Sequence, residues 1–239
     1  MSIPLVIGVL VLLAVIGAVA GVWRSSRVVP AALLAGYLAI FTWGAIAPYD
    51  RATWWAENIP IVVVVTVLVV LYARGVRFSP LAYVLMAVLP YWHTVGGHYT
   101  FERVPFGWFT RVFGFERNMF DRVGHFSVGF FAFGILEFLV SRRAMSRPLA
   151  ALFAVFAIAF VAMSYELIEW WYAAYGGNAQ AGANFLGSQG DVWDAQKDML
   201  MDTLGALVAV LLFFVARPRR DPVNGRPVDA RLPVAGAQP

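Results

Sequence analysis

Residues 191–216 read DVWDAQKDMLMDTLGALVAVLLFFVA, a stretch that joins a polar, aspartate-rich beginning to a long apolar run. After residue 198 its only charged side chain is Asp202. A helix needs about 20 mostly apolar residues to cross the hydrocarbon core of a bilayer. We therefore predict a membrane-spanning helix that begins at Asp191 or Trp193 and ends at Ala216.

The same pattern recurs along the chain. Apolar residues make up 61% of the sequence and charged residues only 13%, whereas a soluble domain carries about 25% charged residues. We expect a break at the Gly96-Gly97 pair, and we expect the aromatic segment 98–118 to lie in the membrane interface. The sequence predicts an all-α, polytopic transmembrane helical bundle of about seven spans. The first six cover residues 3–23, 29–47, 60–73 with a start near Trp54, 79–94, 120–140 and 149–171.

The arginines predict the orientation. Twelve of the eighteen Lys and Arg residues lie in the loops after the first, third and fifth spans or in the C-terminal tail, and such loops face the cytoplasm. The first run lacks the basic start of a signal peptide, so we expect a retained span with the N-terminus outside and the C-terminus cytoplasmic. The predicted organisation is a first span with its basic loop (1–28), a six-span membrane core (29–216) and a disordered cytoplasmic tail (217–239).

Composition excludes several functions. The chain has no cysteine, which excludes disulfides, thiolate zinc sites and cysteine nucleophiles. It has no nucleotide-binding glycine loop, H-E-x-x-H helix or G-x-S-x-G turn. The net charge of +4 comes from loop arginines that set topology, so we expect the lipid bilayer as a partner and no nucleic acid. The sequence leaves the oligomeric state open.

Eleven of the fourteen acidic residues, and all three histidines, fall on the predicted outer side. In the last span the acids follow one helical face, spaced by three, four and four residues; they are Asp191, Asp194, Asp198 and Asp202. Asp202 lies about 16 Å along the helix from Asp191. A carboxylate inside the membrane costs at least about 2.5 kcal/mol and normally faces a partner in the bundle.

Three further segments bring paired ligands at helical spacing: Asp121 with His125, Glu166 with Glu169, and His98 with Glu102. Imidazole with carboxylates suits Zn, Mn or Fe, and oxygen ligands alone suit Mg. We therefore predict a divalent metal site, with Asp194 or Glu169 as a catalytic base. The predicted ligands are His98, Glu102, Asp121, His125, Glu166, Asp198 and Asp202.

Most of these residues also have a purely structural interpretation. Asp121 can pair with the adjacent Arg122, Glu169 can be solvated at the interface beside Trp170, and Asp191 can cap a helix. The lone His93 suits a core or interfacial position. The alternative for the whole site is a hydrogen-bonded polar network, formed by His125, Glu166, Asp198 and Asp202, that locks the bundle.

Several strings resemble the YjdF-type family of bacterial inner-membrane proteins, over roughly residues 29–215. The resemblance implies a multi-pass protein of the bacterial inner membrane and implies no activity. The strings are GGHYTFE (96–102), NMFDRVGHF (118–126), YELIEW (165–170), YDR (49–51) with Trp54-Trp55, and the segment from Gly190 to Gly205.

The second half is more distantly similar to the VanZ-like family, whose members are associated with glycopeptide-type antibiotic tolerance. That family has an Asp-x-x-x-His pair, a Glu in the next helix, and Asp-x-x-x-Asn-x-x-Gly in the last. The corresponding residues here are Asp121, His125, Glu166, Asp198 and Gly205, and Asp202 replaces the Asn. The resemblance implies a site at these positions.

Three functions remain open at this point. The leading hypothesis is an outward-facing metal-dependent hydrolase or transferase acting on a lipid or lipid-linked substrate, with segment 98–118 holding the lipid. The second is a proton- or cation-coupled transporter. The third is a non-catalytic membrane protein with a buried polar network.

Overall fold

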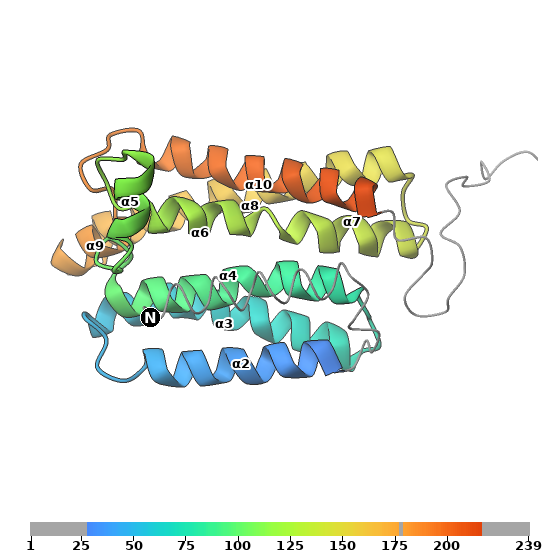
Figure 1. Ribbon diagram of the computed structural model, residues 1–239, viewed down its shortest axis with the longest axis horizontal. Coiled ribbons are helices and arrows are strands. Elements are labelled where there is room, and N and C mark those ends of the chain that lie inside the picture. The colour runs from blue at the N-terminus through green and yellow to red at the C-terminus, as the bar shows by residue number, and fades with distance from the viewer. Residues whose placement is uncertain (1–27, 177–178, 217–239) are drawn as a thin grey trace, which may run out of the picture.

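The computed structural model describes residues 28–176 and 179–216 (Figure 1). The predicted first span (3–23) and the predicted tail (217–239) lie outside these residues. Within the described residues all regular secondary structure is helical, which confirms the all-α prediction. The helices are α2 (Val28–Gly44), α3 (Arg51–Ala73), α4 (Pro80–Tyr99), α5 (Gly107–Phe113), α6 (Phe120–Val128), α7 (Phe131–Ser141), α8 (Arg147–Tyr175), α9 (Ala179–Leu186) and α10 (Asp194–Ala216).

The long helices run side by side and alternate in direction (Figure 1). Helices α2 and α3 pack on α4, while α10 packs on α6, α7 and α8; α4 also contacts α6 and α7, so it joins the two groups. The short helices α5 and α9 lie together at one end of the bundle (Figure 1). The loops 74–79 and 142–146, which carry four arginines, lie at the other end.

Four helical stretches are long and apolar enough to cross a membrane: Arg51–Ala73, Phe120–Ser141, Arg147–Tyr175 and Asp194–Ala216. The apolar helix Val28–Gly44 is shorter. The chain is therefore a polytopic helical membrane protein. The count of seven spans and the orientation of the termini remain predictions.

Local sequence explains where the helices begin. Asp50 caps α3, because its Oδ2 atom accepts hydrogen bonds from the backbone N–H of Thr53 (2.7 Å) and from the Thr53 hydroxyl (2.5 Å). These bonds favour the carboxylate and lower the pKa of Asp50 below its ordinary value. At α4, Ser79 caps the helix and Pro80 occupies its first position, where a missing N–H is tolerated.

One predicted boundary was wrong. The Gly96-Gly97 pair does not break α4, which continues to Tyr99 and ends at Thr100 in the left-handed conformation (φ 60°). These glycines instead allow close packing, since a Cβ at Gly96 would lie 2.5 Å from the ring of Phe101. The predicted span 120–140 corresponds to the candidate membrane span Phe120–Ser141, within which a turn at Gly129 and Phe130 separates α6 from α7.

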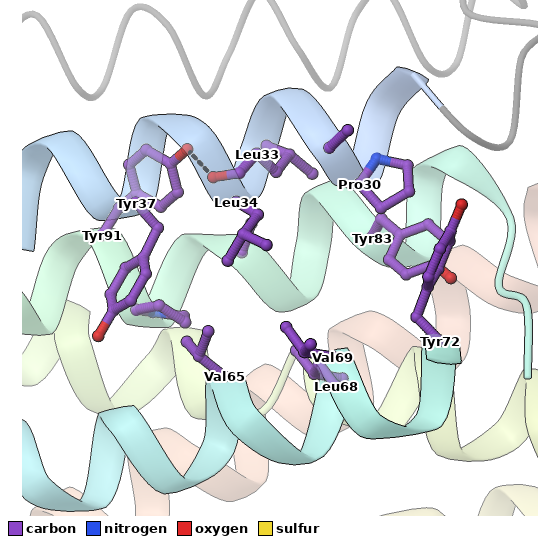
Figure 2. A pocket seen from close by; sticks show the side chains of 13 residues that line it. Pro30, Leu33, Leu34, Tyr37, Val65, Leu68, Val69, Tyr72, Tyr83 and Tyr91 are labelled. Atoms are coloured by element: carbon purple, nitrogen blue, oxygen red, sulfur yellow. Dashed lines mark hydrogen bonds between the residues drawn. The ribbon is translucent and has the colours of Figure 1, made fainter. Parts of the chain in front are cut away.

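An apolar cavity of about 230 Å³ lies between α2, α3 and α4 (Figure 2). Leucine, valine and tyrosine side chains dominate its lining, which contains no acid and no histidine. The Tyr91 hydroxyl donates to the carbonyl oxygen of Leu33 at 2.6 Å across its wall. Among the described residues, this cavity therefore offers no carboxylate or imidazole for metal binding.

Candidate metal centre

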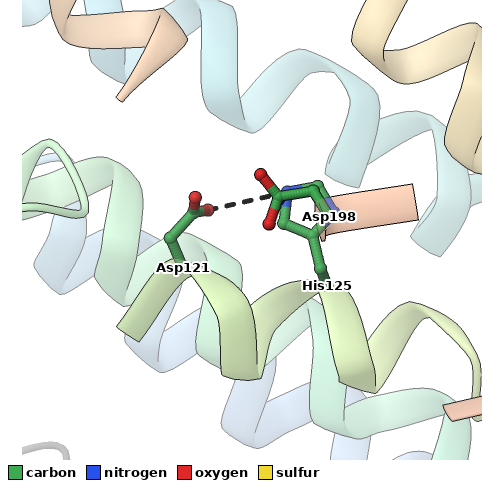
Figure 3. A group of neighbouring side chains, drawn as sticks. All are labelled: Asp121, His125 and Asp198. Carbon is green, nitrogen blue, oxygen red and sulfur yellow. Dashed lines mark ion pairs between the residues drawn. The ribbon is translucent and has the colours of Figure 1, made fainter. Parts of the chain in front are cut away.

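Asp121, His125 and Asp198 converge between α6 and α10 (Figure 3). The His125 Nε2 atom lies 3.7 Å from Oδ1 of Asp121 and 3.8 Å from Oδ1 of Asp198. One ligand atom from each residue lies within 4.8 Å of the other two. Because Asp121 and His125 are four residues apart on one helix, they share a face and both point at α10.

Asp202 orients the imidazole of His125. Its Oδ2 atom lies 3.2 Å from Nδ1 of His125, and both side chains are buried. A proton on Nδ1 satisfies this hydrogen bond and leaves a lone pair on Nε2, directed at the other two carboxylates. A carboxylate that fixes the second ring nitrogen is the usual arrangement around histidines that bind metals.

Two glycines let the helices approach closely enough for these contacts. A Cβ on Gly129 would lie 2.2 Å from the backbone nitrogen of Ala206, and a Cβ on Gly205 would lie 2.0 Å from the carbonyl oxygen of Phe126. Only hydrogen fits at either position. Small residues at a helix crossing allow such backbone contact within membranes, and here the crossing places Asp202 against His125.

Two arginines pair with Asp194 and Asp198, the first two acids of α10. Buried Arg122 forms an ion pair with Asp198 and a 2.5 Å hydrogen bond with Asp194. Arg117 reaches the same Asp194 oxygen at 2.5 Å. Asp194, one of the two predicted bases, is thus held by two cations. The Asp121–Arg122 pair suggested by sequence is replaced by pairing of Arg122 with α10.

Asp191 lies in the turn before α10 and accepts a 3.1 Å hydrogen bond from the backbone N–H of Trp193. Its Oδ2 atom also pairs with Lys197 at 2.7 Å, and these bonds lower the pKa of Asp191. Asp191 therefore stabilises the start of the helix from just outside it, since α10 begins at Asp194.

A cavity of about 140 Å³ adjoins the cluster and reaches α3, α4, α6, α8 and α10. Its second polar group consists of Glu57, His93 and Tyr165. The Glu57 Oε2 atom lies 3.5 Å from Nε2 of His93 and accepts a hydrogen bond from the Tyr165 hydroxyl at 3.2 Å. The acids and histidines that line the cavity are Glu57, His93, Asp121, His125, Glu169 and Asp202.

Glu166 and Glu169 both lie buried on the inner face of α8. Glu169 is buried and lines the cavity. It is therefore not a side chain solvated at the membrane interface. Glu166 interacts electrostatically with His125 and Asp198, and its Oε1 atom lacks a hydrogen-bond partner among the described residues.

His98 and Glu102 are not brought to the cluster. The Nδ1 atom of His98 lies 3.0 Å from the carbonyl oxygen of Gly44, and its ring packs 4.4 Å from Trp43. Glu102 pairs with the adjacent Arg103 at 3.1 Å. Because α4 continues through the glycine pair, His98 faces α2, and neither residue lines the cavity.

Sequence reasoning missed three residues at this site. No site role was predicted for Glu57 or Tyr165, and His93 was expected only at a core or interfacial position. Glu57 lies one helical turn before the valine-rich run of α3. A buried acid preceding an apolar run was the available signal; nothing in the sequence pairs Glu57 with His93, 36 positions away.

The comparisons with known proteins agree with this membrane architecture. The chain is 38% identical over 187 residues to the inner membrane protein YjdF of Escherichia coli (strain K12), an alignment that covers 74% of this chain and 84% of that protein. No solved structure is significantly similar. The chain is a multi-pass protein of the bacterial inner membrane. Residues 29–219 match the family model described as "Predicted membrane protein (DUF2238)", and the chain belongs to this family.

Proposed function

We propose that this protein is a membrane-embedded, metal-dependent hydrolase or transferase that acts on a lipid or lipid-linked substrate. One observation carries the proposal: the Nε2 atom of His125 and carboxylate oxygens of Asp121 and Asp198 lie within 4.8 Å of one another. When the imidazole is neutral, with its proton on Nδ1 and bonded to Asp202, all three atoms are hydrogen-bond acceptors. Acceptors that face one another in a buried site need a cation or a proton between them.

The residues fit a divalent metal. Metal bonds of about 2.0–2.2 Å to nitrogen and oxygen place the ligand atoms of a tetrahedral site about 3.3–3.6 Å apart, so these atoms, now within 4.8 Å of one another, must close by up to about 1.5 Å to bind one ion. One imidazole with two carboxylates favours Zn, Mn or Fe over Mg. Such an ion, when bound, polarises an ester or phosphoryl oxygen or lowers the pKa of a bound water.

The remaining residues have complementary roles in this proposal. Asp202 orients His125, and Arg122 holds Asp198 in place while offsetting its charge. Glu169 faces the cavity and is free of the arginines that bind Asp194. We therefore assign the base to Glu169. The loops rich in arginine lie at the opposite end of the bundle, which supports a site facing outward.

Elemental analysis of the purified, full-length protein tests the metal. We expect about one Zn, Mn or Fe per chain, lost in His125→Gln and in Asp198→Asn. His98→Ala is the matched control, because His98 contacts Gly44 and Trp43 instead of the cluster, and it should keep the metal. A folded, metal-free wild-type protein after reconstitution with each ion would refute the metal site and favour the locked polar network.

Mass spectrometry of lipids tests the activity. Proteoliposomes made from bacterial lipid extract should yield a new lipid product that disappears with chelator, with Glu169→Gln and with His125→Gln. His98→Ala should retain the product. If the metal is present and no lipid changes, the enzymatic part of the proposal is wrong.

A second candidate is proton- or cation-coupled transport. Buried His125 and Asp198, with Asp121 beside them, favour it, because ionisable groups inside a membrane mark ion pathways and proton relays. Ion flux into proteoliposomes that depends on Asp121 and Asp198, without a lipid product, would replace the enzyme with a carrier.

A further inference from the structure

The cavity beside His125 changes from polar to apolar along its depth. On α3 its lining runs from Glu57 through Ile61 to Val64, and on α6 from Asp121 to Val128. Each of these steps spans seven residues, or about 10.5 Å of helix. Both helices begin at the end of the bundle that carries α5 and α9 (Figure 1), so their acids lie at one level and their valines at another.

Helix α8 repeats this gradient in the opposite chain direction. Its lining residues run from Val161 through Tyr165 to Glu169, about 12 Å along the helix, and α8 is antiparallel to α3 and α6 (Figure 1). Glu169 therefore lies at the level of Glu57 and Asp121, and Val161 at the level of Val64. Three helices thus give the cavity an end rich in acids and an apolar end, and Asp202 of α10, which bonds His125, lies between the two.

The apolar end reaches the outer surface of the bundle between α3 and α8. Helix α3 packs on α4 and α9, whereas α8 packs on α7, α9 and α10. Val161 lines the cavity and is 51% exposed. Both helices are candidate membrane spans, so hydrocarbon chains surround this opening. The apolar cavity between α2, α3 and α4 lacks a polar end.

We propose that the cavity beside His125 binds a bilayer lipid that enters between α3 and α8, with its polar group toward Glu57 and Asp121 and its chain toward Val64 and Val128. The inference rests on the proposed function only in taking a lipid as substrate. It assigns the lipid-binding role to the α3–α8 opening instead of the aromatic segment 98–118. An amphiphile fits this cavity because its polar group suits the acidic end. Its chain suits the apolar end and the membrane hydrocarbon outside the opening.

Photocrosslinking tests the path. The probe is a phosphatidylethanolamine with a diazirine in its acyl chain, present in vesicles of phosphatidylethanolamine and phosphatidylglycerol that contain the full-length protein. Leu89 of α4 is the diagnostic position, because it is buried yet lines the cavity. We expect adducts on Leu89 and Val128, as well as on lipid-facing side chains such as Val63 and Phe160.

Two neighbouring variants separate the cavity from the general lipid surface. Ala162→Phe fills the cavity, since Ala162 is buried in its lining, and Met163→Phe enlarges an exposed side chain at the same depth. Ala162→Phe should reduce the Leu89 adduct about tenfold, a change of about 1.4 kcal/mol. Met163→Phe should leave it unchanged, and both variants should keep the thermal stability of the wild type to within a few degrees.

Adducts confined to lipid-facing residues, or a Leu89 adduct that Ala162→Phe does not reduce, would overturn the inference. If Ala162→Phe unfolds the protein, Val64→Trp replaces it, because Val64 is half-buried at the opening. Metal content measured on the same samples keeps the two proposals apart. A metal-loaded protein without the Leu89 adduct refutes the lipid path alone, and an adduct on a metal-free protein supports the path while refuting the metal site.

Discussion

Gly205 of α10 lies so close to Phe126 of α6 that a Cβ on the glycine would stand 2.0 Å from the Phe126 carbonyl oxygen. The obstacle is backbone, which cannot rotate away as a side chain can. This contact sets the distance between the two helices that carry the candidate metal ligands. The geometry of the centre therefore depends on a residue that contributes no ligand.

Gly205→Ala should separate α6 from α10 and reduce both stability and metal binding. Overpacking usually costs about 1–3 kcal/mol, and we expect the upper end because backbone must move. Gly107→Ala is the control, since a Cβ there would meet only the flexible end of Arg111 at 3.4 Å. Thermal unfolding in detergent and metal content measure the effect; equal losses in the two variants would show that the close crossing is unimportant.

Asp202→Asn should weaken metal binding while preserving the fold. The amide is nearly isosteric, but it can donate to Nδ1 of His125 and thereby favour the tautomer whose Nε2 carries the proton. Loss of such an orienting partner typically lowers metal affinity about 10–100-fold. Titration with a competing chelator measures the affinity. Asp50→Asn makes the same change at the start of α3, where the carboxylate bonds Thr53, and should retain wild-type affinity.

Much of the fold could be predicted from hydrophobic runs alone. The apolar runs ending at Ala73, Ser141 and Ala216 are long enough to cross a bilayer. Inside the bilayer a helix satisfies every backbone hydrogen-bonding group, so these runs predict membrane helices. The glycines were harder to interpret, because a glycine can break a helix or allow a close contact. Gly96 packs against Phe101 within α4, and Gly129, at the turn between α6 and α7, packs against the backbone of Ala206. Both glycines allow a close contact, and the sequence alone does not show which residue is the neighbour.

The site could be predicted only where spacing on one helix was sufficient. Asp121 and His125, and likewise Asp198 and Asp202, share helical faces because they are four residues apart, and they meet in the structure. Glu102 also fits a spacing rule, yet it pairs locally with Arg103. Contacts between distant helices, such as the one between Glu57 and His93, depend on packing that periodicity does not encode.

The stability of the α3 start should depend on pH through Asp50. Hydrogen bonds from Thr53 lower the pKa of this carboxyl in the folded state, so its contribution is present above about pH 3.9, the ordinary aspartate pKa. It is lost as the pH falls through the folded pKa. Asp50→Asn keeps an N-cap without the charge. The difference in thermal stability between wild type and variant should therefore shrink as the pH falls below about 3.9 and disappear below the folded-state pKa of Asp50. A constant difference from pH 7 to pH 3 would refute this role.

Arg122→Met should destabilise the protein far more than Arg103→Met. Arg122 is 4% exposed and binds Asp194 and Asp198, so its loss leaves buried Asp198 without its arginine and Asp194 with Arg117 alone. Breaking a buried ion pair from one side costs about 3–5 kcal/mol, whereas the Arg103–Glu102 pair is partly exposed and should contribute less than about 1 kcal/mol. Thermal unfolding distinguishes the two. Because a divalent ion at Asp198 would replace part of the missing charge, added Zn²⁺ or Mn²⁺ should recover stability in Arg122→Met more than in Arg103→Met; equal responses would argue against a cation site at Asp198.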